Sequence, residues 1–219
     1  MTVKARAVLL SIFSLIACQF VTMTAIAGST IVALGDSLTA GYGLPSGQGF
    51  AGQLQDTLRA RGHDVTVIDA GVSGDTSTGG LARLDWSVPE DADAVIVELG
   101  ANDALRGLDP SITRKALSDI VKRLKARGQR VLLAGMKAPP NLGDDYAEEF
   151  DVIYPELAAA EEVLFYPFFL DGVAADPALN QADGIHPSAD GVAKIVEKIL
   201  PSVETLIAQI DAPAGGKAD

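Results

Sequence analysis

Five short apolar runs, separated by longer segments with helical spacing, constrain the fold of this chain more than any other feature. Runs of this length, rich in β-branched residues, are typical of strands buried on both faces of a sheet. Each intervening segment is long enough for a crossover, which favours parallel strands covered by helices. The sequence therefore predicts an α/β fold, a three-layer α/β/α sandwich with a five-stranded parallel sheet. The predicted strands are residues 31–34, 65–68, 94–99, 130–134 and 163–166.

The segments between the predicted strands carry helix signals. The clearest helix has Asp109 as its N-cap, Pro110 at its first position and Gly128 at its end. Residues 75–84 are rich in Gly and Thr, so we expect a loop that leads into a short helix. Pro201 interrupts the last helical pattern, and we expect a kink or a break there. The remaining predicted helices are residues 50–58, 150–160 and 192–199.

Length and charge limit the number of domains and the classes of partner. The chain has 219 residues, of which 48% are hydrophobic, enough for one domain with a sizeable core. We place this domain at residues 28–211 and expect the tail, residues 212–219, to be disordered. The formal net charge of -12 repels phosphate backbones and anionic lipid head groups, so we expect no nucleic-acid partner.

The N-terminus has the pattern of an export signal. Lys4 and Arg6 precede an apolar run over residues 7–17, and the Ala-Ile-Ala triplet at 25–27 is a small-x-small cleavage site. We therefore expect a signal peptide at residues 1–27 and a periplasmic or secreted mature protein.

Cys18 leaves a second interpretation of this segment open. The run from Leu15 to Cys18 resembles a bacterial lipobox, which would leave a lipidated N-terminus, and an uncleaved single-span anchor is a further alternative. Without lipidation we expect no stable membrane partner. Because Cys18 is the only cysteine, a domain starting at residue 28 has no disulfide and no thiol nucleophile.

A serine follows the first predicted strand. Ser37 comes two residues after Gly35, at the carboxyl end of the strand, where a turn leads into a helix. Loops at the carboxyl ends of parallel strands share one rim of a sheet, so the loops with Gly74 and Asn102 belong to the same rim. Ser37 could act there as a nucleophile or could cap the helix, and position alone favours the cap.

The chain has two histidines that could serve as a base for a serine. His63 lies in a polar turn at the amino end of the second predicted strand, on the opposite rim, and we interpret it as a solvated turn residue. His186 lies just before the last helix. Asp183, three residues earlier, can fold back through the Gly184 turn and accept from one ring nitrogen, which would orient the other toward Ser37.

Two residues are candidate donors to an oxyanion at this rim. Gly74 has no side chain to block its N–H group, and Asn102 can aim its amide into the same space. Taken singly, each residue is also an ordinary turn residue.

Other polar or aromatic residues near the predicted site have simpler structural roles. Glu98 lies inside a buried strand, where we expect it to pair with an arginine such as Arg83. Asp36 and Asp103 are expected to hold loops by accepting from backbone N–H groups, and Trp86 is expected in the core or over the second loop. No residues have metal-ligand spacing and no glycine-rich loop carries a nucleotide-binding lysine, so we expect no metal and no cofactor.

Four sequence blocks, in order and at strand ends, carry a family resemblance. The chain resembles the SGNH (GDSL) hydrolase family over about residues 30–206, and within it the thioesterase I, lysophospholipase L1 and arylesterase group. One departure lies in the second loop, where Gly71 stands in place of a serine common in this group. The blocks are Gly35-Asp36-Ser37-Leu38, Ser73-Gly74-Asp75-Thr76, Gly100-Ala101-Asn102-Asp103 and Asp183-Gly184-Ile185-His186-Pro187.

The resemblance implies a flavodoxin-like sandwich and a serine hydrolase that cleaves carboxylic esters or thioesters. It implies Ser37 as nucleophile, His186 as general base and acid, and Asp183 as the residue that orients His186. The implied oxyanion hole consists of the backbone N–H groups of Ser37 and Gly74 and the side chain of Asn102.

Short connecting segments without an inserted lid favour an open groove for small or single-chain acyl substrates. Leu105, Leu108, Pro139 and Leu142 are the candidate residues for its acyl-facing wall. Two rival functions remain: a carbohydrate O-acetylesterase with the same triad, and a flavodoxin-like binding module, whose phosphate-binding loop the chain lacks. We expect a monomer that acts on a small-molecule ester or thioester.

Overall fold

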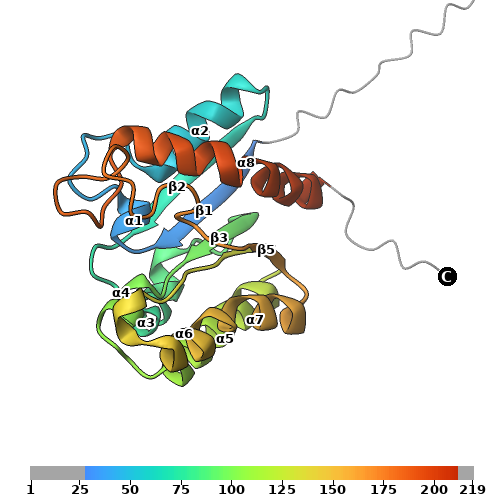
Figure 1. The fold of residues 1–219 in the computed structure, drawn as a ribbon. Helices are drawn as coiled ribbons and strands as arrows, with labels where there is room; N and C mark the ends of the chain where they lie inside the picture. Colours follow the sequence, from blue (N-terminus) through green and yellow to red (C-terminus); the bar gives the residue numbers. More distant parts are fainter. Residues whose placement is uncertain (1–27, 212–219) are drawn as a thin grey trace, which may run out of the picture.

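The sheet has five parallel strands in the order β2-β1-β3-β4-β5 (Figure 1). The structure is a computed structural model and describes residues 28–211; the predicted signal peptide (1–27, with Cys18) and the predicted disordered tail (212–219) lie outside the described residues. Each strand lies on one of the predicted apolar runs, which confirms the five-stranded parallel sheet. The strands are β1 (Ser29–Gly35), β2 (Val65–Gly71), β3 (Ala94–Glu98), β4 (Arg130–Ala134) and β5 (Leu164–Tyr166).

Strand register places the carboxyl ends of the strands along one rim. Gly35 at the end of β1 is the register partner of Gly71 on β2 and of Glu98 on β3. Glu98 in turn lies opposite Ala134 at the end of β4. The loops that leave these strands therefore begin side by side, although they are distant in sequence.

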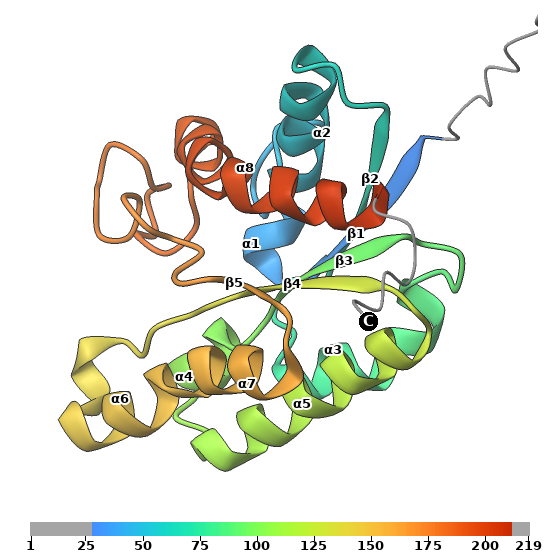
Figure 2. The same cartoon turned by 90° about the vertical axis from the view of Figure 1, so that its right-hand side faces the viewer.

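Helices cover both faces of the sheet (Figure 2). The helices α1, α2 and α8 lie on one face, and α3 to α7 lie on the other. This gives the predicted three-layer sandwich. The helices are α1 (Ser37–Ala40), α2 (Phe50–Ala60), α3 (Ser77–Ser87), α4 (Ala101–Leu105), α5 (Pro110–Ala126), α6 (Asp144–Asp151), α7 (Ile153–Glu161) and α8 (Ala189–Asp211), with a 3-10 turn, η1 (Pro140–Leu142).

Local signals predicted α5 well and α8 less well. Asp109 caps α5 by accepting from the N–H of Ser111 at 2.8 Å, as expected from its position. Of the two expected outcomes at Pro201, the break is wrong, because α8 continues through this residue to Asp211, and the kink stays a prediction. A proline inside a helix costs about 3 kcal/mol or more. The apolar stripe on both sides of it offsets this cost, since Ile199 and Val203 are fully buried.

Three further details differ from the sequence-based expectations. The helix predicted at 150–160 is two helices, α6 and α7, which meet at Val152. The short elements α4 and η1 were not predicted, because so few residues show no helical periodicity. Trp86 is 81% exposed, so its expected place in the core or over the second loop is wrong. On α3 it is Arg83 and Leu84 that face inward, and Trp86 lies on the solvent side.

Candidate active site

The end of β1 positions Ser37 as the first residue of α1. Asp36 is the N-cap of this helix, and its Oδ1 accepts from the N–H of Leu38 at 2.9 Å. A side chain at Gly35 would overlap the side chain of Thr39 and lie 2.6 Å from Glu98 Oε2, so only glycine allows α1 to pack this closely. Because Asp36 is the cap, the alternative interpretation of Ser37 as the cap no longer applies.

Ser37, His186 and Asp183 form a continuous chain of hydrogen bonds. Nε2 of His186 lies 3.0 Å from Oγ of Ser37, and Nδ1 lies 2.7 Å from Oδ2 of Asp183. The other oxygen of Asp183, Oδ1, accepts from the N–H groups of Ile185 and His186 at 2.9 and 3.0 Å. The carboxylate therefore holds both the ring and the backbone of the turn that carries it.

These contacts keep Asp183 ionised. The N–H and the ring of His186, together with the N–H of Ile185, lower the pKa of Asp183 to about 2. A carboxylate at Nδ1 fixes the tautomer in which Nδ1 carries the proton and Nε2 has a free lone pair. The lone pair faces the hydroxyl of Ser37, as removal of its proton requires.

The loop that carries His186 is anchored to the loop after α1. The N–H of Gln181 donates to the carbonyl of His186 at 2.7 Å, and Gln181 Nε2 donates to the carbonyl of Tyr42, also at 2.7 Å. The ring of Tyr42 lies 4.6 Å from the His186 ring, centroid to centroid. These contacts fix the imidazole on the side of Ser37, and nothing in the sequence pattern identified Gln181 or Tyr42.

The two predicted oxyanion donors come from the loops after β2 and β3. Asn102 lies on α4 and lines the same cavity as Ser37 and His186. Gly74 has a φ of +84°, which favours glycine, and its carbonyl accepts from Arg106 at 2.7 Å. Gly74 is not among the residues that line this cavity, so its role as a donor stays a prediction.

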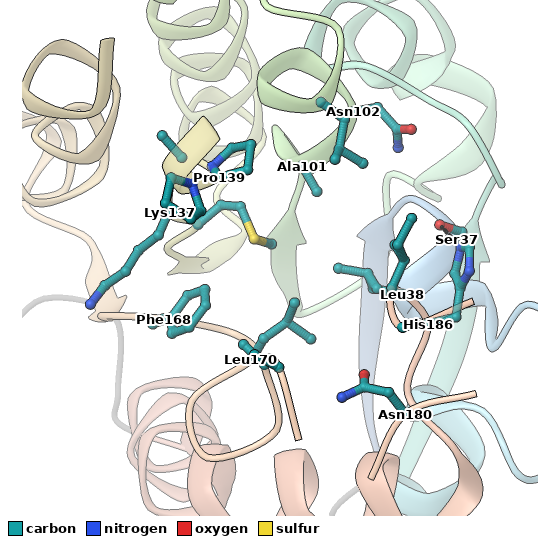
Figure 3. A pocket seen from close by; sticks show the side chains of 18 residues that line it. Ser37, Leu38, Ala101, Asn102, Lys137, Pro139, Phe168, Leu170, Asn180 and His186 are labelled. Atoms are coloured by element: carbon teal, nitrogen blue, oxygen red, sulfur yellow. Dashed lines mark hydrogen bonds between the residues drawn. The ribbon is translucent and has the colours of Figure 1, made fainter. Parts of the chain in front are cut away.

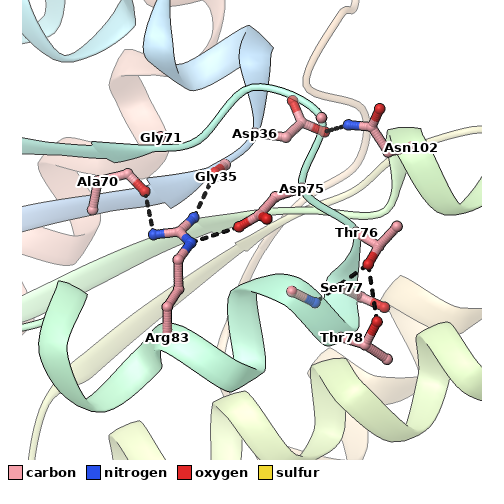
Figure 4. Close-up of polar contacts among 12 residues, drawn as sticks. Gly35, Asp36, Ala70, Gly71, Asp75, Thr76, Ser77, Thr78, Arg83 and Asn102 are labelled. Carbon is pink, nitrogen blue, oxygen red and sulfur yellow. Dashed lines mark hydrogen bonds and ion pairs between the residues drawn. The ribbon is translucent and has the colours of Figure 1, made fainter.

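A buried arginine joins the ends of β1 and β2 to the loop that contains Gly74 (Figure 4). Arg83 donates through Nε to Asp75 at 2.5 Å, and its other two nitrogens donate to the carbonyls of Ala70 and Gly35, each at 2.8 Å. The expected pairing of Arg83 with Glu98 is therefore wrong. Asp75, next to Gly74 in the sequence, is its partner.

Two buried carboxyl groups lie behind the Ser37 turn. Oε2 of Glu98 accepts from Oγ1 of Thr39 at 2.8 Å and from the N–H of Asp36 at 3.4 Å. Burial, and then the charge of Asp36, raise the pKa of Glu98 well above its ordinary value. Burial also raises the pKa of Asp36, to about 6. Both carboxyl groups are therefore harder to ionise than in water.

The expected loop contacts of the two aspartates are confirmed. The N–H of Leu38 donates to Asp36, and the N–H of Ser77 donates to Asp103 at 2.8 Å. Asp103 also accepts from the hydroxyl groups of Ser77 and Thr113, at 2.5 and 3.0 Å, and so joins α3, α4 and α5.

An apolar cavity of about 440 Å³ opens beside Ser37 and His186 (Figure 3). Of the four residues predicted for the acyl-facing wall, Leu105 and Pro139 line this cavity, whereas Leu108 and Leu142 do not. Sequence reasoning missed most of the lining, because it lies on irregular segments after β4 and β5 and before α8. The main apolar residues missed are Leu38, Met136, Phe168, Leu170, Ala174 and Ile185.

His63 lies away from this site, as predicted. Its Nε2 is 3.5 Å from Oε1 of Glu204 on α8, in the turn that precedes β2. Within residues 28–211, no group of three or more His, Cys, Asp or Glu side chains is arranged to hold a metal ion. In the same range, no helix is both long enough and apolar enough to cross a bilayer.

The arrangement places a hydroxyl beside an oriented imidazole and next to an apolar cavity, the geometry that a serine nucleophile with a base requires. This fold and this site define an ester-cleaving hydrolase with a serine at the centre of its site. A family model described as "GDSL-like Lipase/Acylhydrolase family" matches residues 33–194. The chain belongs to this family, which confirms the resemblance to the GDSL hydrolases.

Two relatives align with more than four fifths of this chain. Esterase TesA of Pseudomonas aeruginosa is 41% identical over 182 residues, which are 83% of this chain and 90% of the relative. Thioesterase 1/protease 1/lysophospholipase L1 of Escherichia coli K12 is 37% identical over 187 residues, 85% of this chain and 88% of the relative.

Solved structures agree with this result. A crystal structure of TesA superposes with a TM-score of 0.77 at 40% identity, covering 81% of this chain and 99% of that one. The esterase EstA of a Pseudoalteromonas species, in a structure inhibited by monoethylphosphonate, gives a TM-score of 0.77 at 32% identity, covering 82% and 99%.

Proposed function

We propose that this protein hydrolyses carboxylic esters and thioesters of small or single-chain acyl groups through an acyl-enzyme on Ser37. The observation that carries the proposal is the 3.0 Å contact between Ser37 Oγ and His186 Nε2, with Asp183 2.7 Å from Nδ1. A serine becomes a nucleophile when a base of this kind takes its proton.

The proposed reaction has two similar halves. Ser37 Oγ attacks the carbonyl carbon while His186 takes its proton, and the carbonyl π electrons move onto the oxygen. The N–H groups of Ser37 and Gly74 and the amide of Asn102 donate to this oxyanion. When it collapses, the leaving alkoxide or thiolate takes the proton from His186. Water then attacks the acyl-enzyme with the same base, which releases the acid and restores Ser37.

The cavity favours an acyl chain as the group next to the scissile carbonyl. Its walls are mostly apolar side chains, with Phe168 and Leu170 at a distance from Ser37 and Asn102 (Figure 3). An acetyl group would leave most of this lining without contact, so the alternative of a carbohydrate O-acetylesterase is less well supported. Relatives are named esterase TesA, arylesterase, and thioesterase 1/protease 1/lysophospholipase L1, which is consistent with ester and thioester substrates.

Covalent labelling tests the nucleophile directly. An alkyl phosphonate ester with a nitrophenyl leaving group should add one phosphonyl mass to the protein, on the peptide that contains Ser37. Ser37→Ala should take up no label and should lose hydrolysis of nitrophenyl esters, acyl thioesters and lysophospholipids. Labelling at another residue, or hydrolysis retained by Ser37→Ala, would contradict the assignment.

Asn102→Ala tests the proposed oxyanion hole. Loss of one donor of this kind typically lowers kcat by about 10²–10³-fold. The matched control is Asn141→Ala, which removes the same amide from an exposed position on η1 outside the cavity. A kcat near that of the unchanged protein would remove Asn102 from the mechanism.

We also propose that the protein is exported and works as a monomer. The charged start, the apolar run and the Ala-Ile-Ala triplet at 25–27 support cleavage after Ala27. N-terminal sequencing of the protein from periplasm or medium should begin at Gly28, whereas a lipidated chain would begin at Cys18 and partition with membranes. Light scattering of the purified protein should give the mass of one chain.

A further inference from the structure

Asp36 makes two side-chain contacts that link the Ser37 turn to the loop after β3, and Figure 4 shows the contact with Asn102. The residue is fully buried. Its Oδ1 accepts from the N–H of Leu38, which caps the helix that carries Ser37. Its Oδ2 accepts from Nδ2 of Asn102 at 3.0 Å, across 66 residues of sequence. One carboxylate therefore holds both α1 and a candidate oxyanion donor.

The contact with Asp36 determines which side of the Asn102 amide faces the carboxylate. An amide carries two N–H bonds on its nitrogen and only lone pairs on its oxygen, whereas an ionised carboxylate can only accept. The Asn102 nitrogen must therefore face Asp36. One N–H bond is used there, and the other remains for a carbonyl oxygen bound next to Ser37. If the amide turned over, its oxygen would face Asp36 and the N–H groups would move away.

We propose that Asp36 is a positioning residue, which acts on the reaction by fixing Asn102 with its nitrogen toward the oxyanion. This inference rests on the proposed function, because it assigns Asp36 a role through the oxyanion hole of that reaction. Asp36 does not touch the reacting atoms. It acts through the orientation of another side chain.

Asp36 is still charged at neutral pH, because burial raises its pKa only to about 6. Glu98 lies behind it and accepts from its N–H group, and Oε1 of Glu98 has no hydrogen-bond partner among the described residues. The charge of Asp103 adds to the effect of burial, whereas hydrogen bonds from Leu38 and Asn102 lower the pKa of Asp36. Asp36 is thus the acceptor that the contact with Asn102 requires.

Asp36→Asn is the sharpest test because it changes one oxygen and keeps the size of the side chain. An asparagine caps helices about as well as an aspartate, so the contact with Leu38 is kept. Its amide nitrogen would face the nitrogen of Asn102, so Asn102 should turn over and present its oxygen to the variant side chain. We expect kcat to fall by about 10²–10³-fold, as for loss of an oxyanion donor, with KM changed less than about threefold.

A double-mutant cycle separates positioning from a general structural effect. If Asp36 acts through Asn102, Asp36→Asn should change kcat less than about threefold in an Asn102→Ala background. Losses that multiply in the double variant would overturn the proposal. So would a folded Asp36→Asn protein with kcat near that of the unchanged protein. If instead Asn102→Ala alone keeps full activity, it is the proposed oxyanion hole that fails.

A second variant covers the case in which Asp36→Asn does not fold. Asp36→Ser keeps a good helix cap but is too short to reach Asn102. It should lower kcat less than Asp36→Asn would, because Asn102 loses its partner without being forced to turn, and the loss should again vanish in the Asn102→Ala background. The proposal would also be overturned if Asp36→Ser kept the kcat of the unchanged protein and its crystal structure showed the Asn102 amide in the same orientation.

Discussion

Replacing Arg83 by methionine tests how the second loop of the site is held. The variant keeps an apolar stem but removes the donors to Asp75, Ala70 and Gly35. The Arg83 and Asp75 side chains are 9% and 19% exposed, so the ion pair is largely buried. Removing one partner of a buried pair costs about 3–5 kcal/mol. Because water still reaches part of Asp75, we expect the lower end of this range, about 3 kcal/mol.

Urea unfolding followed by far-UV circular dichroism measures this cost. With a slope of about 2 kcal/mol per molar urea, a loss of about 3 kcal/mol lowers the midpoint by about 1.5 M. The matched control is the double variant Arg83→Met with Asp75→Asn, which also removes the uncompensated charge. It should recover part of the lost stability, since most of the cost arises from the carboxylate left without a partner.

Two results would refute this reasoning. A midpoint for Arg83→Met within about 0.3 M of the unchanged protein, less than 1 kcal/mol at the same slope, would show that the pair contributes little. A double variant less stable than Arg83→Met would show that Asp75 is held by groups other than this arginine.

Three further predictions concern the second loop, the triad and the cavity. Gly71→Ser should lower both the urea midpoint and kcat, because a Cβ there would lie 2.8 Å from the Cα of Ala40 and closer still to its nitrogen. This overlap would push α1 away from β2, and unchanged values would contradict the packing. Asp183→Asn should lose most activity. The lowered pKa of Asp183, about 2, gives a stabilising contribution that is present above the unfolded value of about 3.9 and is lost as the pH falls toward 2. The stability difference between the unchanged protein and Asp183→Asn should therefore shrink between pH 4 and pH 2 in acid titrations, and a constant difference would count against it. Phe168→Ala should lower kcat/KM for octanoyl esters more than for acetyl esters, and an equal loss on both would place the acyl chain elsewhere.

The central strands β1 and β3 could be predicted because burial on both faces leaves an unbroken apolar run in the sequence, whereas the edge strand β2 alternates buried and exposed residues and was found from its valines and isoleucine. The same signal is absent from α4, whose five residues carry Asn102 and Asp103 and show no periodicity. At Pro201 the helix does not break, since tertiary burial of the α8 stripe outweighs the missing hydrogen bond.

The residues that meet at the candidate site could be predicted from the sequence, but the directions in which the surrounding side chains point could not. Ser37, Asp183 and His186 could be brought together because strand ends share a rim, and Asp183 lies three residues from His186. No local pattern shows which carboxylate the Arg83 side chain faces, and the expected partner, Glu98, is not the one found. The cavity wall from Phe168 to Leu170 lies on an irregular segment after β5, whose course depends on packing that no local pattern encodes.

The hydrogen bond between Ser37 and His186 joins residues 149 positions apart in the chain. Closing so long a loop costs conformational entropy. The hydrogen bond therefore forms only when the first strand and the last loop have both docked on the same sheet. Return of hydrolysis during refolding thus reports the arrival of the longest-range contact of the site, whereas circular dichroism reports helices that can form earlier. A lag of hydrolysis behind circular dichroism would measure the time that the two ends of the domain need to come into contact.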